Sequence, residues 1–227
     1  MVWSTNSVQS YPKGVRKVSQ TDPLDDWLSK QPTNVHRRVK RLMEVVREAY
    51  PIGVPALIVK SQTDRLGDAG GYSFHLGTPD VVLRRICSWL LTHGDEDILV
   101  KLIPELWRRG GREDLALAAL LLANLSSVEN VWVKLGEVVG TRSTAEALLL
   151  SIEECLRAKH EPPTEALLID WCQQSLAHSH LALLVCHAVW VRAKRPPLSV
   201  NLAEQFKNIE YPDGDSLLVR VRDQILD

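Results

Sequence analysis

The residues of this chain best suited to chemistry are clustered cations, whose positive charge and N–H donors match phosphate oxygens. Three clusters stand out: Arg37, Arg38, Lys40 and Arg41, with Arg47 beyond them; Arg84 and Arg85; and Arg108, Arg109 and Arg112. Such clusters are typical of proteins that contact the backbone of nucleic acids. The alternative for the first cluster is a charged helix face that only meets solvent.

The place of each arginine pair in its expected helix separates structural from functional roles. Arg108 and Arg109 fall in the last turn of a helix, where cations are favourable without a ligand because they oppose the helix dipole. Arg84 and Arg85 fall in the first half of their helix, where this explanation fails. We therefore regard Arg84 and Arg85 as the better candidates for phosphate contacts.

A second group of reactive side chains lies in the C-terminal third of the chain. It comprises Cys172, His178, His180, Cys186 and His187. Cysteine and histidine are the usual zinc ligands, but this spacing matches no zinc signature and the four cysteines contain no CxxC pair. We expect these cysteines to be small core residues, and we expect neither a metal nor another cofactor.

The elements that position these residues are expected to be helices throughout. Helical spacing of apolar residues, with capping residues, proline and glycine at the ends, recurs along the chain. The expected helices cover residues 23–28, 33–50, 78–93, 96–109, 112–125, 126–140, 143–159, 164–177 and 179–194, followed by two shorter ones. Thr78, Ser126 and Ser143 are expected to cap three of them. The helix at 112–125 is so apolar that it must be buried nearly all round.

Short loops between these helices predict the architecture. Successive helices must then pack antiparallel, which predicts an all-α, irregular stack of antiparallel helical hairpins of the HEAT or armadillo type, an α-solenoid. We expect residues 1–20 to be a flexible N-terminal segment and residues 21–227 to be a single helical-repeat domain.

The net charge of the 227 residues is −1, but the charge is unevenly distributed. Residues 1–50 contain nine Lys or Arg against five Asp or Glu, whereas residues 161–227 contain six against nine. Nucleic-acid binding needs a local basic surface rather than a basic total, so this distribution permits it. No apolar run reaches the length of a membrane span and residues 1–14 lack an apolar signal core. We therefore expect a cytoplasmic protein without a membrane partner.

The order of several short motifs in residues 71–140 resembles the alkylpurine DNA glycosylases of the AlkD type, which are built from HEAT-like repeats. Segment 72–79 followed by residues 83–85 (Leu-Arg-Arg) is similar to the family's opening motif, in which an aromatic residue, Leu-Gly and Thr-Pro precede a basic helix. Leu106-Trp107 followed by Arg112-Glu113 and an Ala/Leu-rich helix is similar to a second motif of the family.

The resemblance implies a basic concave surface that holds duplex DNA and cleavage of the glycosidic bond of a cationic alkylated purine. That reaction needs a carboxylate to stabilise an oxocarbenium-like sugar, and aromatic faces favour the positive charge. Trp132 aligns with the first of two Trp residues that begin a family helix, and Glu137 aligns with the catalytic Asp. An enzyme of this kind would be a DNA glycosylase that releases N3- or N7-alkylated purines. The alternatives are a core Trp132 and a solvated Glu137.

Other positions depart from the family pattern. Val133 stands at the second Trp, the segment 183–185 has no Arg where the family has one, and no clear Trp follows Trp190. Tyr72 and Arg112 complete the candidate DNA contacts, although Tyr72 could instead anchor its Gly-rich loop to the core. We expect a DNA-binding helical-repeat protein whose glycosylase activity is reduced or lost. The alternative is a non-enzymatic scaffold that binds a protein partner on the concave face.

Overall fold

All regular secondary structure in the described residues is helical. The computed structural model describes residues 22–59, 72–139, 144–211 and 216–227. The helices are α1 (Pro23–Ser29), the 3-10 helix η1 (Thr33–Arg37), α2 (Val39–Ala49), α4 (Asp80–His93), α5 (Glu96–Arg109), α6 (Arg112–Asn124), α7 (Val131–Val139), α8 (Ala145–Arg157), α9 (Glu165–Cys172), α10 (Leu176–Arg192), α11 (Val200–Lys207) and α12 (Leu217–Leu226). The all-α prediction is therefore confirmed, whereas the predicted flexible segment 1–20 lies outside the described residues.

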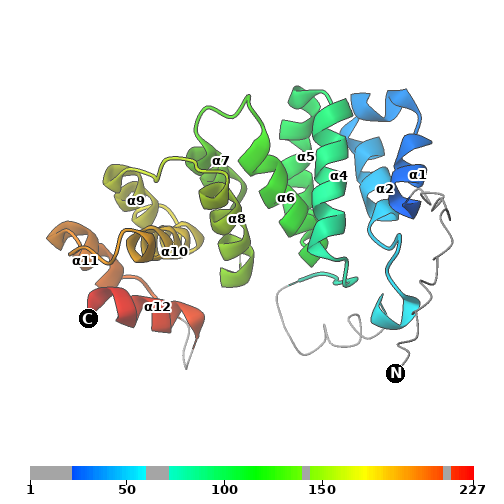
Figure 1. Cartoon of the computed structure of the whole chain (residues 1–227). Coiled ribbons are helices and arrows are strands. Elements are labelled where there is room, and N and C mark those ends of the chain that lie inside the picture. Colours follow the sequence, from blue (N-terminus) through cyan, green and yellow to red (C-terminus); the bar gives the residue numbers. More distant parts are fainter. Residues whose placement is uncertain (1–21, 60–71, 140–143, 212–215) are drawn as a thin grey trace, which may run out of the picture.

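The helices follow one another across the molecule in chain order, from α1 at one end to α11 and α12 at the other (Figure 1). Helices α4, α6, α8, α10 and α12 each pack against the next member of that series, and α2, α5 and α7 do the same. Contacts between α4 and α5, α5 and α6, and α7 and α8 join the two sets, and α9 packs against α10 and α11. The core is consequently long and continuous rather than compact around one centre.

Helix α6 is the most deeply buried element. It packs against α4, α5, α7 and α8, and every residue from Glu113 to Ala123 is buried. The sequence predicts this burial for the Leu and Ala residues, because α6 has no polar stripe to turn toward water. Glu113 and Asp114, in the first turn, are buried as completely as the leucines, which the apolar pattern does not predict.

The predicted helix at residues 33–50 is broken in the structure. Arg38 has an extended backbone (φ −143°, ψ 122°) between η1 and α2. The break allows Val35 to enter the core while the ring of His36 lies against Trp89 of α4, with ring centroids 4.7 Å apart. The cations before and after Arg38 consequently lie on two short elements and not on one helix face.

Several helix starts differ from the predicted caps, because the predicted residue binds another group or another residue caps the helix. The Thr78 hydroxyl donates to the Tyr50 carbonyl at 3.0 Å and makes no cap for α4. The Ser126 hydroxyl binds Glu96 instead, and Asn130 accepts the N–H groups at the start of α7. Thr144 caps α8, whereas Ser143 lies outside the described residues. The boundary between the last two long predicted helices also shifts, since Ser175 caps α10 and α9 ends at Cys172.

Candidate functional site

Arg84, one of the two favoured phosphate candidates, is engaged by carboxylates of the chain itself. Its Nη2 lies 2.7 Å from Glu154 Oε1 of α8, and its Nε lies 2.9 Å from Asp80 Oδ2 on its own helix. The hydrogen bond to Glu154 is the main reason that the pKa of Arg84 is raised. Arg84 thus crosses α6 to join α4 to α8.

Arg85 is engaged in the same way toward the other side. It pairs with Asp22 at 2.8 Å and with Asp25, which stand before and within α1. The hydrogen bond from Arg85 lowers the pKa of the Asp22 carboxyl. Both arginines of α4 therefore have their charge balanced within the fold, and a phosphate would have to displace a carboxylate to reach either one.

The first basic cluster presents the opposite situation. Arg37, Arg38, Lys40, Arg41 and Arg47 are all exposed. Within the described part of the chain none of these five side chains has an ion-pair partner within 4 Å, although Glu44 and Glu48 stand on the same helix. Five cations against two carboxylates give the η1–α2 surface an excess of positive charge that the fold leaves uncompensated.

A groove between α2 and α5 extends this surface. A cavity of about 470 Å³ is lined by Val39, Lys40, Met43, Lys101, Glu105 and Arg108, and we call it the α2–α5 groove. Arg108 is held by Glu105 at 2.6 Å, whereas Lys40 and Lys101 have no ion pair among the described residues. The groove therefore presents ammonium groups from two helices above a partly apolar floor.

A second cavity, of about 340 Å³, lies where the ends of α2 and α5 meet the segment before α4. It is lined by Arg47, Tyr50, Phe74, Leu76 and Arg109, and we call it the Arg109 cavity. Arg109 Nε and Nη2 each lie 2.5 Å from an oxygen of Asp114, and its guanidinium carbon stands 5.0 Å from the centre of the Phe74 ring. The Tyr50 hydroxyl donates to the same Asp114 carboxylate at 2.9 Å. Burial raises the pKa of Tyr50 well above its ordinary value, so this hydroxyl keeps its proton.

Glu113 organises the segment that carries Tyr72 and Phe74. Its Oε1 accepts N–H groups from Leu76 at 2.9 Å, Gly77 at 3.0 Å and Thr78 at 3.3 Å. Gly77 has a φ of +76°, which brings the three successive amides toward one oxygen and which a side chain would oppose. No described group makes a hydrogen bond to the other oxygen, Oε2.

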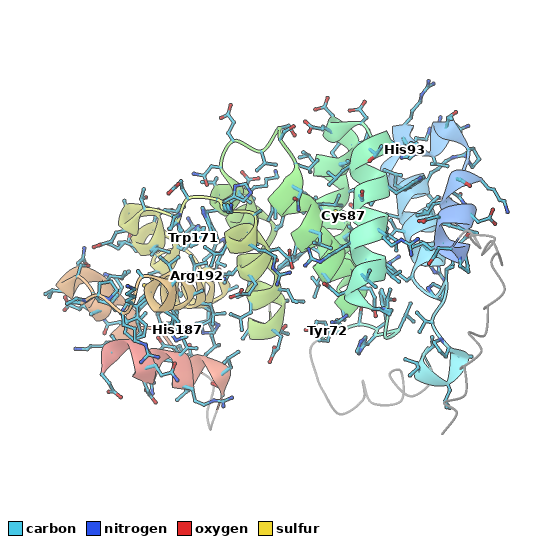
Figure 2. The ribbon with its side chains drawn as sticks, viewed as in Figure 1. Tyr72, Cys87, His93, Trp171, His187 and Arg192 are labelled. Carbon is cyan, nitrogen blue, oxygen red and sulfur yellow. The ribbon has the colours of Figure 1, made fainter. Side chains whose placement is uncertain are left out.

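Tyr72 and Arg112, two further predicted DNA contacts, flank this anchored segment. Tyr72 is half-buried at the end of the α4–α6 group opposite His93 (Figure 2), and burial raises its pKa. The Arg112 backbone N–H donates to the Phe74 carbonyl at 2.9 Å. The Arg112 side chain is half-buried and has no ion pair within the described part of the chain. The loop is thus fixed to the start of α6 by main-chain contacts as well as by Glu113.

The structure does not bring Trp132 and Glu137 together. They lie five residues apart on α7, which places them about 140° apart around the helix axis. Trp132 is only 2% exposed and its indole N–H donates to the Glu161 carbonyl at 2.6 Å. Glu137 is exposed and its carboxylate pairs with Lys134 at 2.6 Å. Val133, which stands where the family has its second Trp, is 43% exposed and does not form a pocket with either residue.

Each of the three His residues of the C-terminal group has its own hydrogen-bond partner, whereas Cys172 and Cys186 are free thiols, half-buried and buried respectively. His178 contacts the Ser175 hydroxyl and the Gly136 carbonyl, and His180 contacts the Glu210 carbonyl. His187 lies on the side of α10 toward α12 (Figure 2), with its Nε2 3.0 Å from Gln224. Within the described ranges no group of three or more His, Cys, Asp or Glu side chains is placed to hold a metal ion. The same ranges contain no helix of the length and apolarity needed to cross a membrane.

The signals available in the sequence explain which site residues it missed. The helix dipole accounts for Arg109 in the sequence, but its partner Asp114 stands in the first turn of a helix that is apolar from Leu115 to Ala123. Two acids directly before such an apolar run are a sign of buried partners. Comparison with protein-family models, with curated proteins and with solved structures found no match.

Proposed function

We propose that this chain is an irregular HEAT-like array of helical hairpins, an α-solenoid, which binds duplex DNA and does not remove bases. The consecutive packing within the α4–α12 and α2–α7 series supports the solenoid, since each helix meets its counterpart in the next hairpin. The contact surface is the η1–α2 surface together with the α2–α5 groove.

One observation carries the proposal: the cations at residues 37, 38, 40, 41 and 47 are exposed and lack carboxylate partners in the described part of the chain. Uncompensated cations retain their counterions until a polyanion replaces them, and release of those counterions drives DNA binding. Arg84 and Arg85, by contrast, contribute little, because their carboxylate partners would compete with phosphate. The cations at residues 37–41 are therefore better candidates for phosphate contacts than the two arginines of α4.

The test compares two variants that lose the same charge. The first changes Arg37, Arg38, Lys40 and Arg41 to Gln. The control changes four exposed cations from the other half of the chain to Gln, namely Lys159, Lys194, Arg195 and Lys207. Fluorescence anisotropy with a labelled duplex, over a series of salt concentrations, measures both.

We expect the first variant to bind DNA at least about tenfold more weakly and to lower the slope of log K against log salt by about 3 to 4, since each lost phosphate contact removes about 0.9. The control variant should keep most of the wild-type slope. Equal losses in the two variants would mean that binding follows net charge alone, and the η1–α2 surface would then lose its role.

The non-catalytic part of the proposal rests on α7. A buried Trp132 and a Glu137 paired with Lys134 offer no shared pocket for a sugar. A base-release assay on alkylated duplex should therefore detect no 7-methylguanine or 3-methyladenine from the wild-type protein. If the wild-type protein did release these bases and the Glu137→Gln variant did not, the chain would be a glycosylase that uses Glu137.

The second candidate function is the binding of a protein partner by the series of helices from α4 to α12. Ion pairs join α4 to α8 through Arg84 and Glu154, and α8 to α10 through Glu153 and Arg192. These pairs remove the net positive charge that DNA would require there, and they suit a polar protein surface better. Two results together would favour this candidate over DNA: no detectable DNA binding at any salt concentration, and a complex with a protein partner that Arg192→Glu disrupts.

A further inference from the structure

We propose that the Arg109 cavity is a binding site for a small aromatic oxyanion, meaning a flat apolar body that carries one carboxylate or phosphate group. This site adjoins the DNA surface proposed above and shares Arg47 with it. Its volume of about 340 Å³ falls in the range of cavities that hold small organic ligands.

The cavity contains a guanidinium that is fixed before any ligand arrives. Arg109 donates hydrogen bonds from Nε and from one Nη2 hydrogen to Asp114, and it stands over the rings of Phe74 and Tyr50. Its Nη1 makes no hydrogen bond with a described residue, so three of its five N–H donors are available to a ligand. The Arg109 side chain is 25% exposed, so a ligand can reach those donors without unfolding. Fixed donors bind an oxyanion at a smaller entropic cost than a free side chain does.

A second guanidinium supplies the net charge. Arg109 and Asp114 neutralise each other, but Arg47 is exposed, lines the same cavity and has no ion pair within the described residues. The nearby Glu113 directs one carboxylate oxygen to three backbone amides. The cavity therefore suits a ligand with a single oxyanion group better than a polyanion, because only one cation at its mouth is uncompensated.

The remaining walls select an apolar, flat body. Phe74 and Leu76 are half-exposed and line the cavity beside the two arginines. Aromatic rings stack on guanidinium planes and on other rings, so an aryl group gains contacts here that an inorganic ion lacks. Tyr50 is fully buried and forms the floor, with its hydroxyl already given to Asp114.

The experiment is isothermal titration of the full chain with four probes: benzoate, phenyl phosphate, inorganic phosphate and benzyl alcohol. We expect saturable binding of benzoate or phenyl phosphate with a Kd of about 1 mM or below, as is usual for fragments of this size. Inorganic phosphate and benzyl alcohol, which each lack one half of the ligand, should bind at least about tenfold more weakly. The stronger of the two aryl probes identifies the oxyanion.

Three variants and one matched control locate the site. Arg47→Gln should weaken aryl oxyanion binding about tenfold, and Leu76→Trp, which fills the cavity, should abolish it. Arg41→Gln is the matched control, because it removes the same charge from α2 without touching the cavity. Arg109→Lys keeps a cation beside Asp114 but loses the fixed fork, and it should also weaken binding.

The proposal is overturned if no aryl probe saturates up to about 10 mM, if inorganic phosphate binds as well as phenyl phosphate, or if Arg47→Gln and Arg41→Gln behave alike. Failure of the DNA proposal has a different signature. Leu76→Trp should leave duplex binding unchanged. The variant of residues 37, 38, 40 and 41 should keep its affinity for the aryl probes within about threefold of the wild type, because these residues do not line the cavity and act on it only through long-range charge.

Discussion

Asp114 brings a carboxylate to a position that solvent does not reach, and the fold tolerates it through two specific partners. Arg109 meets both of its oxygens and the Tyr50 hydroxyl adds a third donor. Burial nevertheless raises the pKa of Asp114, with the Arg109 hydrogen bond acting in the opposite direction. The arrangement ties α2, α5 and α6 together at one point, because each of the three residues comes from a different helix or its end.

Removing the cation from this arrangement should be costly. Arg109→Met leaves a buried carboxylate without its counter-charge, and we expect the free energy of unfolding to fall by about 3–5 kcal/mol. Arg108→Met, one residue earlier, removes an exposed pair with Glu105 and should destabilise the chain far less. Urea denaturation of both variants measures the contrast, and similar losses would show that the Asp114 pair contributes no more than a surface contact.

Gly111 offers a second residue-scale prediction. A methyl group at this position would overlap the ring of Phe74, which lies directly on the glycine. Gly111→Ala should therefore destabilise the chain by about 1–3 kcal/mol through overpacking. Phe74→Leu makes room for the methyl group, so the double variant should lose less stability than the two single variants added together. Strict additivity in thermal unfolding would contradict the contact.

At the scale of elements, α6 is the common neighbour of α4 and α8, since both pack against it. Arg84 of α4 binds Glu154 of α8, although the two residues lie 70 positions apart in the sequence. The ion pair therefore links two helices that share α6 as a neighbour.

A double-mutant cycle tests that connection. Arg84→Met, Glu154→Gln and the double variant should give a coupling of about 0.5–1 kcal/mol, kept small because Arg84 is about one-third exposed. The pair between Arg192 and Glu153 joins α8 to α10 with both side chains about half exposed. It should show a weaker coupling, below about 0.5 kcal/mol. A larger value for the second pair would contradict the role of burial.

The contact between η1 and α4 should make stability depend on pH. The His36 ring is tilted against Trp89 and stacks on His93. Burial lowers the pKa of His36 from 6.5, with the nearby His93 acting in the same direction. The unfolded chain, with an ordinary His36, takes up the proton before the folded chain does. Acidification below about pH 6.5 therefore favours unfolding until the folded pKa is passed.

His36→Phe keeps a ring in this stack and removes the titration. The variant should lose less stability than the wild type between pH 7 and about pH 5, as measured by chemical denaturation at each pH. Part of the slope should remain, because burial also lowers the pKa of His75. An unchanged slope would mean that His36 stays accessible to protons in the folded chain.

The elements also show what the sequence can predict. The ends of α5 and α6 follow from Gly110 and from the apolar run 115–125, because local propensity and burial agree there. The break at Arg38 was not predicted, since it depends on Val35 and His36 meeting residues of α4. The partners of Arg84 and Arg85 were equally hidden: Glu154 lies 70 residues beyond Arg84, and no local pattern marks such a pair. Whether an arginine is free for phosphate is a tertiary property.

At the scale of the whole molecule, stability should vary along the array. In the described part of the chain the main contacts of each helix are with its near neighbours, so the ends can open without disturbing the middle. Amide hydrogen exchange should be slowest in α6 and in the buried part of α10, and faster in α1, α11 and α12. Uniform protection from end to end would instead indicate a single cooperative unit.

The all-round burial of α6 has a consequence for how the protein is made. The ribosome releases the chain from its N-terminus, so α4 and α5 emerge before the helix that covers their shared apolar sides exists. Until residue 125 has left the exit tunnel, the nascent chain exposes these apolar sides, and exposed apolar surface of this kind promotes aggregation. The thirteen residues of α6 then cover α4 and α5, but the side of α6 that packs against α8 stays exposed until residue 157 has followed.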